Sequence, residues 1–87
     1  MLKLKCHANK IGEFSEIDKI ILIPKKISDE FEVGEDEYSL DGQKMRLRVY
    51  DIPCNCSQKM HTHRIIDLRE AWEKLNLSDG QEVEIGR

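Results

Sequence analysis

The sequence lacks any long hydrophobic run, and this absence bounds where the protein can work. The longest apolar stretch, Ile20–Ile23, has only four residues, whereas a membrane-spanning helix needs about 20. No secretory signal precedes the first predicted strand. We therefore expect a cytoplasmic protein that does not enter a membrane.

An excess of positive charge is also missing. The 87 residues include 14 Lys and Arg against 17 Asp and Glu, which gives a formal net charge of −3. Proteins that bind nucleic acid mainly through phosphates present a basic surface, so strong electrostatic binding of that kind is not expected. A local basic patch is still compatible with this charge. With 39% hydrophobic residues, the chain should fold as one domain, residues 1–87, around a single modest core.

The three cysteines are too few to form a disulfide framework, and their number is odd. In a reducing cytosol, clustered cysteines bind metal more often than they form disulfides. Two of the three cysteines and two of the three histidines fall between positions 54 and 63, and these are Cys54, Cys56, His61 and His63.

This Cys-x-Cys and His-x-His arrangement predicts a zinc-binding hairpin. Side chains at i and i+2 of a strand share a face, and a turn at Gln58–Lys59 would pair Cys56 with His61. The same register would pair Cys54 with His63. Thiolate and imidazole are preferred zinc ligands, four of them in a closed structural site. In the alternative interpretation, the cysteines are small buried hydrophobes and the histidines are polar residues on an exposed strand.

The third cysteine, Cys6, ends an alternating strand and is predicted to lie in the core. Whether Cys6 or His7 joins the metal site stays open at this point. No catalytic or cofactor-binding residue is predicted, because no nucleophile–base signature and no substrate-binding loop is visible.

The apolar patterns predict a mostly β fold of the α+β class. Residues 17–23, which end in the apolar run Ile20–Ile23, are predicted to form a strand that is covered on both sides, and Asp41–Gly42 between two alternating segments indicates a hairpin. A helix is predicted over residues 68–75, with Asp67 as its N-cap and Glu70 completing a capping box. We expect a small single-domain barrel of about six strands, with this one C-terminal helix before the last strand.

Three further local predictions can be compared with the structure. Residues 25–31 should form a short helical turn. The acidic run at residues 35–37 is expected to be a solvated loop. A bulge is expected near residues 51–53, because the inward parity of Met45, Leu47 and Val49 does not continue to Ile52.

Two segments carry a resemblance to a known class of barrels. The stretch from Ile65 to Ile85, which ends in Leu77-Ser78-Asp79-Gly80-Gln81-Glu82-Val83-Glu84-Ile85, resembles the strand–helix–strand unit of AbrB-type and related cradle-loop barrels. Archaeal CTP-dependent riboflavin kinases end in a similar way. The stretch Ile20–Ile27 resembles the strand-to-helix corner of AbrB-type proteins. The resemblance implies a barrel architecture and no particular functional residue.

Three functions are compatible with these observations. The first is a zinc-binding scaffold or interaction module with a protein partner or a second copy of itself, since so short a chain often needs a metal to stabilise it. The second is an AbrB-like nucleic-acid-binding regulator, which the acidic charge disfavours, with Lys25, Lys26, Arg46 and Arg48 on phosphates. The third, and least favoured, is a small metalloenzyme with Asp51 or Asp67 as base.

Overall fold

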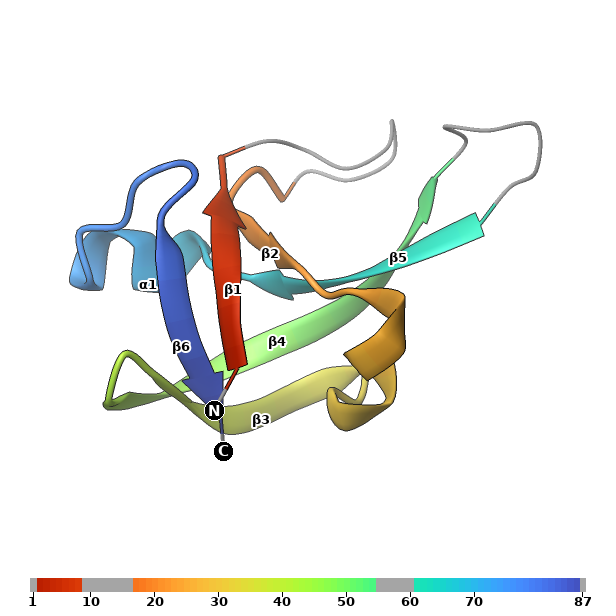
Figure 1. Cartoon of the computed structure of the whole chain (residues 1–87), viewed down its shortest axis with the longest axis horizontal. Helices are drawn as coiled ribbons and strands as arrows, with labels where there is room; N and C mark the ends of the chain where they lie inside the picture. Colours follow the sequence, from red (N-terminus) through yellow and green to blue (C-terminus); the bar gives the residue numbers. More distant parts are fainter. Residues whose placement is uncertain (1, 9–16, 55–60, 87) are drawn as a thin grey trace.

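The computed structural model describes residues 2–8, 17–54 and 61–86, which form one β barrel with a single α-helix (Figure 1). Its elements in chain order are β1 (Leu2–His7), β2 (Ile20–Leu22), the 3-10 helix η1 (Lys25–Glu30), β3 (Gly34–Leu40), β4 (Gln43–Cys54), β5 (His61–Asp67), α1 (Arg69–Lys74) and β6 (Glu82–Gly86). The predicted mostly β barrel of about six strands, with one helix before the last strand, is confirmed.

All neighbouring strands are antiparallel, and the sheet closes on itself in the order β1-β2-β5-β4-β3-β6. Closure removes most of the unpaired edges that an open sheet would expose. Asp41 helps to close the barrel, because its carboxylate accepts the Glu84 N–H and its own N–H donates to the Glu84 carbonyl, each at 2.8 Å.

Two strands continue beyond the barrel wall. β4 pairs with β3 only as far as Val49, and β5 pairs with β2 only from Ile65 towards its end. Residues 51–54 and 61–64 therefore pair with each other and have no other strand neighbour among the described residues. We call this two-stranded segment the β4–β5 arm, and it extends to the right in Figure 1.

The barrel interior is filled by side chains of one strand parity. Ile21, Val49 and Ile66, on three successive strands, expose no surface at all. α1 packs its apolar stripe against this core, and η1 lies on the opposite side of the barrel (Figure 1). After η1, the Phe31 ring stacks on Tyr38 with 5.9 Å between centroids. The helical turn predicted for residues 25–31 is therefore confirmed.

A second apolar cluster lies on the outer face of β2, β5 and β4. Its buried members are Ile17, Ile20, Ile52 and Ile65, with Leu22 and Tyr50 packed against them. Successive residues of a strand face opposite ways, so Ile20 joins this outer cluster while Ile21 joins the interior. Both are fully buried, which confirms that this strand is covered on both sides.

The outer cluster also explains why the predicted bulge near residues 51–53 is wrong. The pairing of β4 with β5 runs without a break from Arg48↔Asp67 to Cys54↔His61. The apolar residues change parity because Val49 belongs to the interior and Ile52 to the outer cluster. Because β4 is buried on both faces in this region, it needs no bulge to bury Val49 and Ile52.

The predicted Asp41–Gly42 turn joins β3 to β4. The φ angles of the two residues are 50° and 84°, and positive φ at both central positions defines a type I′ turn. The acidic run at residues 35–37 lies within β3, so its prediction as a loop is wrong, although the run is exposed to solvent as predicted. Glu35 and Glu37 are opposite Arg48 and Arg46, and opposite charges across two strands stabilise their pairing.

α1 begins one residue later than predicted and ends at a recognisable motif. Its N-cap is Leu68, and no side chain forms the predicted capping box; the Asp67 carboxylate accepts the Arg69 N–H instead, at 3.0 Å. Asn76 has a φ of 53°, and the Leu77 N–H donates to the Trp72 carbonyl at 3.0 Å. This is a Schellman C-cap, which turns the chain back towards β6.

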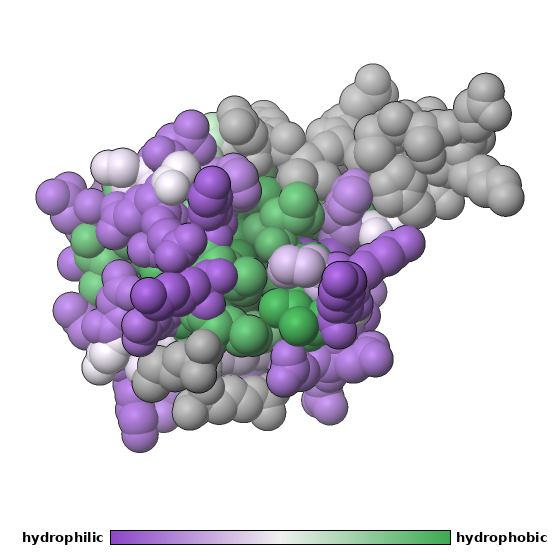
Figure 2. All heavy atoms as spheres, viewed as in Figure 1, coloured by the Kyte–Doolittle hydropathy of each residue, from purple (hydrophilic) through white to green (hydrophobic). Residues whose placement is uncertain are grey.

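Hydrophilic residues surround the hydrophobic ones on the face shown in Figure 2. Among the described residues, the only exposed large hydrophobic side chain is Val33, at 54%. Exposed large hydrophobic side chains therefore do not mark a functional site within the part of the chain that the structure describes. The search for such a site turns to polar groups.

Candidate functional site

The β4–β5 arm brings two of the predicted zinc ligands opposite each other. Cys54 is the register partner of His61 at the outer end of the described arm, and Ile52 pairs with His63 two positions nearer the barrel. The predicted pairing of Cys54 with His63 is therefore wrong by two residues. The register is thus not the one that a turn at Gln58–Lys59 would give. Cys56 lies outside the described residues.

The described residues alone contain no group of three or more His, Cys, Asp and Glu residues suited to holding a metal ion. The predicted zinc site depends on Cys56 and on the side chains of Cys54 and His61, which lie outside that description. The predicted ligand set Cys54, Cys56, His61 and His63 therefore stays a prediction. His63, the one ligand whose side chain is described, is partly buried.

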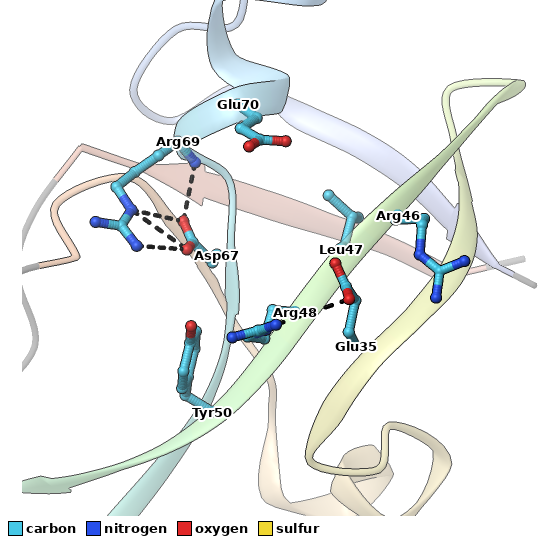
Figure 3. Close-up of a pocket in the computed structure, with 8 residues that line it drawn as sticks. All are labelled: Glu35, Arg46, Leu47, Arg48, Tyr50, Asp67, Arg69 and Glu70. Atoms are coloured by element: carbon cyan, nitrogen blue, oxygen red, sulfur yellow. Dashed lines mark hydrogen bonds and ion pairs between the residues drawn. The ribbon is translucent and has the colours of Figure 1, made fainter.

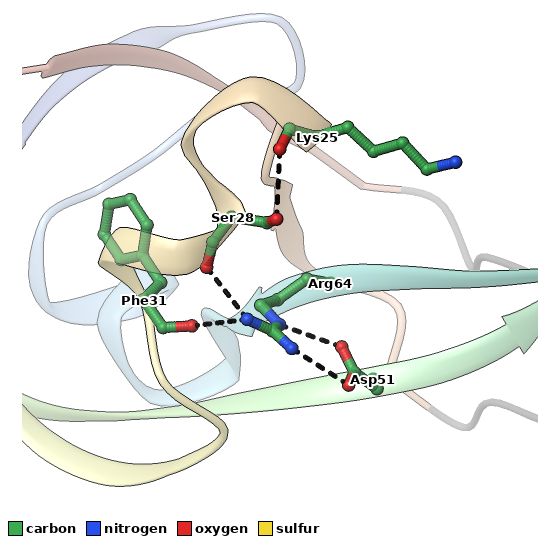
Figure 4. Close-up of polar contacts among 5 residues, drawn as sticks. All are labelled: Lys25, Ser28, Phe31, Asp51 and Arg64. Atoms are coloured by element: carbon green, nitrogen blue, oxygen red, sulfur yellow. Dashed lines mark hydrogen bonds and ion pairs between the residues drawn. The ribbon is translucent and has the colours of Figure 1, made fainter.

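Arg64 fixes the base of the arm to the barrel (Figure 4). Its guanidinium makes a bidentate pair with Asp51 across the two strands, with Nε–Oδ1 at 2.9 Å and Nη2–Oδ2 at 3.2 Å. The remaining nitrogen, Nη1, donates to the carbonyls of Ser28 and Phe31 at 2.9 and 3.2 Å. One side chain thus joins both strands of the arm to the end of η1.

This arrangement changes the chemistry of Asp51. The hydrogen bonds from Arg64 lower the pKa of the Asp51 carboxyl, because they stabilise its charged form more than partial desolvation disfavours it. A carboxylate with a lowered pKa and both oxygens engaged is a poor general base. Asp51 is therefore a structural ion-pair partner, which weakens its predicted role as a catalytic base.

Asp67, the other predicted base, is held in a similar way. Its carboxylate accepts from the Arg69 side chain, with Nη2–Oδ2 at 2.8 Å, and also accepts the Arg69 backbone N–H. The side chain of Asp67 is 15% exposed and that of Arg69 is 49% exposed. Both predicted bases thus serve as anchors for arginine side chains.

Cys6 lies in the barrel interior, as predicted, and it is fully buried. Burial raises the pKa of its thiol to about 11, with a smaller contribution from the negative charge of Asp41. Metal coordination requires the thiolate, and this environment keeps the thiol protonated. The structure therefore assigns Cys6 to the core; the adjacent His7 pairs with Ile20 of β2.

An open groove lies beside α1, on the side of the barrel where β5 ends (Figure 3). Its largest hollow has a volume of about 470 Å³, and its lining residues are Glu35, Arg46, Leu47, Arg48, Tyr50, Asp67, Arg69 and Glu70. Arg48 lies 3.7 Å from Glu35, and Arg69 is held by Asp67. Two of the three arginines are therefore paired with carboxylates.

A second hollow lies beside η1 and the base of the arm. Its volume is about 550 Å³, and its lining residues are Leu22, Ile23, Pro24, Lys25, Ser28, Asp51, Thr62, His63 and Arg64. Lys25 thus lies on a different part of the surface from Arg46 and Arg48. The four residues predicted to contact phosphates do not line one common hollow.

Sequence reasoning missed Arg64, whose partners Ser28 and Phe31 are 36 and 33 positions away in the chain. The only available signal was its position beside His63 on a predicted strand. Asp41 was recognised as a turn residue, but its carboxylate bond to β6 was not predicted. Long-range polar contacts of this kind leave no periodic pattern in a sequence.

The fold and its polar contacts define a class: a small closed antiparallel barrel of six strands with one short helix. Within the described residues, no helix is long and apolar enough to cross a membrane. Comparison of the chain with family models, with curated proteins and with solved structures finds no match. The resemblance to AbrB-type barrels therefore stays a prediction, and function must be argued from the chain itself.

Proposed function

We propose that this protein is a small cytoplasmic zinc-binding scaffold, with Cys54, Cys56, His61 and His63 as ligands at the end of the β4–β5 arm. One observation carries the proposal: the backbones of Cys54 and His61 are register partners. Directly opposite residues of an antiparallel pair have Cβ atoms about 4.5–5.5 Å apart. That separation suits a thiolate and an imidazole that share one ion at about 2.3 and 2.0 Å.

His63 belongs to the same part of β5 as His61. His63 follows His61 by two positions on β5, so the two residues belong to the same face of the strand. On a flat strand, residues two positions apart are separated by about 6.6 Å, which is wide for two short side chains. The proposal therefore requires Cys54 and Cys56 to lie closer together than they would on a flat strand.

A metal at this position would supply stability where the fold itself supplies little. The arm lies beyond the pairing with β2 and β3, and an isolated two-stranded hairpin is at best marginally stable in water. Arg64 and the outer apolar cluster secure its base. A zinc ion would secure its far end, as structural metals do in other small domains.

The engagement of Asp51 and Asp67 by arginines supports a structural role over a catalytic one. A zinc enzyme keeps an open coordination position and a base near it. Of the two carboxylates proposed as that base, Asp51 has a lowered pKa and Asp67 is bound to Arg69. The metalloenzyme hypothesis is accordingly the weaker of the two metal hypotheses.

The nucleic-acid regulator remains the alternative from a different class. Lys25, Lys26, Arg46 and Arg48 are exposed, as phosphate contacts must be. However, Arg48 pairs with Glu35, and the exposed acidic run of β3 lies directly beside the basic residues of β4. A partner protein fits this mixed surface better than a polyanion does.

Cobalt substitution combined with one variant tests the proposal. A closed site with four protein ligands should give a tetrahedral cobalt spectrum that does not respond to azide. His63→Ala should free one coordination position and make the spectrum sensitive to azide, while His7→Ala, the matched control, should leave it unchanged. An azide-sensitive wild-type spectrum would instead favour the metalloenzyme, and a His7→Ala effect would place His7 at the metal.

A further inference from the structure

β4 extends beyond the end of its neighbour β5, and this leaves part of the edge of β4 unpaired. The pairing with β5 stops at Arg48↔Asp67, because the chain then departs into α1. The earlier part of β4, residues 43–47, pairs with β3 on one side. On the other side it has no strand neighbour among the described residues. A short gap in the barrel wall therefore separates β4 from α1.

The direction of the backbone groups at this gap follows from the hydrogen bonds on β5. The Ile23 N–H donates to the Arg64 carbonyl at 2.9 Å, so the backbone of Arg64 faces β2. Alternate residues of a strand direct these groups to opposite sides, hence the Asp67 backbone faces β4 and pairs with Arg48. By the same alternation, the N–H and C=O groups of Arg46 and Lys44 face the gap.

The gap opens into a groove made of two adjoining hollows. The hollow of about 470 Å³ beside Arg48 continues into a second hollow of about 290 Å³ between β4 and α1. Both are lined by Arg46, Leu47 and Glu70, and the second extends to Lys74. In Figure 3, Leu47 and Glu70 lie on the two sides of this space, on β4 and α1.

The charges around the gap indicate what would fill it. Arg48 has an acidic residue on each side in the sheet, Glu35 on β3 and Asp67 on β5. Arg46, two residues away on the same face, has Glu37 on β3 and, among the described residues, no strand partner on the side of β5. The row across the sheet at Arg46 therefore lacks one acidic neighbour that the row at Arg48 has.

We propose that this groove binds an extended acidic segment of a partner protein, which adds to β4 as an antiparallel strand in line with β5. Addition of a strand to an exposed edge is an established way to recognise peptides, with affinity from the backbone and selectivity from alternate side chains. The residue opposite Arg46 would be acidic, like Asp67 opposite Arg48. Its neighbours would point inward, towards Leu47 and Ala71, and would be apolar.

The other free edge of β4 is protected, which makes the gap the accessible one. Pro53 pairs with Thr62, and by the alternation above its nitrogen faces away from β5, towards the open edge of the arm. Proline at an edge prevents strand addition because it offers no donor. Residues 43–47 contain no proline, so the edge at the gap keeps its donors.

The probe for this inference is the fluorescein-labelled peptide Glu-Val-Glu-Val-Glu, blocked at both ends, with polarisation as the readout. We expect saturable binding, and slower amide hydrogen exchange at Lys44 and Arg46 in the complex. Methylation of the central Glu nitrogen, which would face β4, should weaken binding at least about tenfold, the equivalent of about 1.4 kcal/mol. Methylation of a Val nitrogen, which would face away from β4, should weaken it less. Equal losses from both modifications would overturn the strand-addition geometry.

Two variants test the same site from the protein side. Arg46→Glu should weaken peptide binding about tenfold or more through like-charge repulsion, whereas Lys25→Glu, in the hollow beside η1, should have little effect. Arg46→Pro removes a donor that faces the gap and spares the bonds to β3, so it should abolish binding in a folded protein. Binding unaffected by Arg46→Glu would refute the proposal. So would tighter binding of a single-stranded oligothymidine, which would indicate a nucleic-acid surface.

Discussion

Arg64 and Asp51 face each other across the β4–β5 arm, and their bidentate ion pair joins its two strands. Its two hydrogen bonds measure 2.9 and 3.2 Å, and the same guanidinium also binds two carbonyls at the end of η1. Three segments far apart in the sequence thus converge on one side chain. Removal of the Arg64 side chain should therefore lower the stability of the fold.

Arg64→Ala should lower the free energy of unfolding by about 1–3 kcal/mol, because it leaves a carboxylate and two carbonyls without their charged donor. For a domain of this size, that corresponds to a fall of roughly 5–15 °C in melting temperature. Arg48→Ala is the matched control, because its exposed pair with Glu35, at 3.7 Å, should contribute little to stability. Thermal unfolding followed by circular dichroism measures both, and equal effects would contradict the assigned role of Arg64.

The Asp51–Arg64 pair should also make stability depend on pH. The pKa of Asp51 is lower in the folded protein than its ordinary value of 3.8, so the folded state favours the charged carboxylate. The contribution of the pair is therefore fully present above that ordinary value and is lost as pH falls through the lowered pKa. The stability difference between wild type and Asp51→Asn should shrink in urea titrations as the pH falls below about 4.

Glu32→Gln provides the control for this measurement. Its carboxylate is exposed, and it forms no ion pair with any other described residue. Glu32→Gln should change the free energy of unfolding only slightly, and by the same amount with and without the Arg64 side chain. An Asp51→Asn effect that is constant from pH 7 to pH 2 would mean that the carboxylate charge is not what stabilises the arm.

The barrel could be predicted from the sequence because its signals are local and periodic. Asp41–Gly42 specifies a turn that requires positive φ, and the stripe beginning at Leu68 specifies the helix that packs on the core. The register of the arm could not be predicted, because a hairpin's register depends on the length of its connection. The outer cluster was missed because Ile17 and Ile52 come together only once the barrel closes.

The same distinction between local signals and long-range contacts applies to the predicted site. The Cys-x-Cys and His-x-His pattern marked the arm as unusual, and the structure makes Cys54 and His61 register partners. The argument against Asp51 and Asp67 as bases depends on their contacts with Arg64 and Arg69. Whether a carboxylate is free or held by an arginine is decided by the folded arrangement of side chains and not by residue type.

Cys6 should be unreactive in the native protein. Its thiol is fully buried, and its pKa is raised to about 11, so the nucleophilic thiolate is nearly absent at neutral pH. We expect iodoacetamide to leave Cys6 unmodified in the folded protein and to modify it rapidly in guanidinium chloride, as peptide mapping by mass spectrometry would show. Native labelling at the denatured rate would contradict its place in the core.

Duplex DNA should bind weakly and without sequence preference. The net charge is −3, and Arg48 and Arg69 are already paired with carboxylates, so few phosphates can be neutralised. An electrophoretic shift assay in low salt should show no complex at nanomolar concentrations. A nanomolar complex that dissociates steeply with added salt would favour the AbrB-like regulator over the zinc scaffold.

Native mass spectrometry of the purified protein, together with its melting temperature, tests the central claim most directly. We expect one zinc-sized mass increment per chain, which a chelator removes and added zinc restores, with a higher melting temperature in the zinc-bound form. Cys6→Ser should retain the increment, whereas Cys54→Ser should lose it. A metal-free chain whose melting temperature does not change when zinc is added would contradict the account.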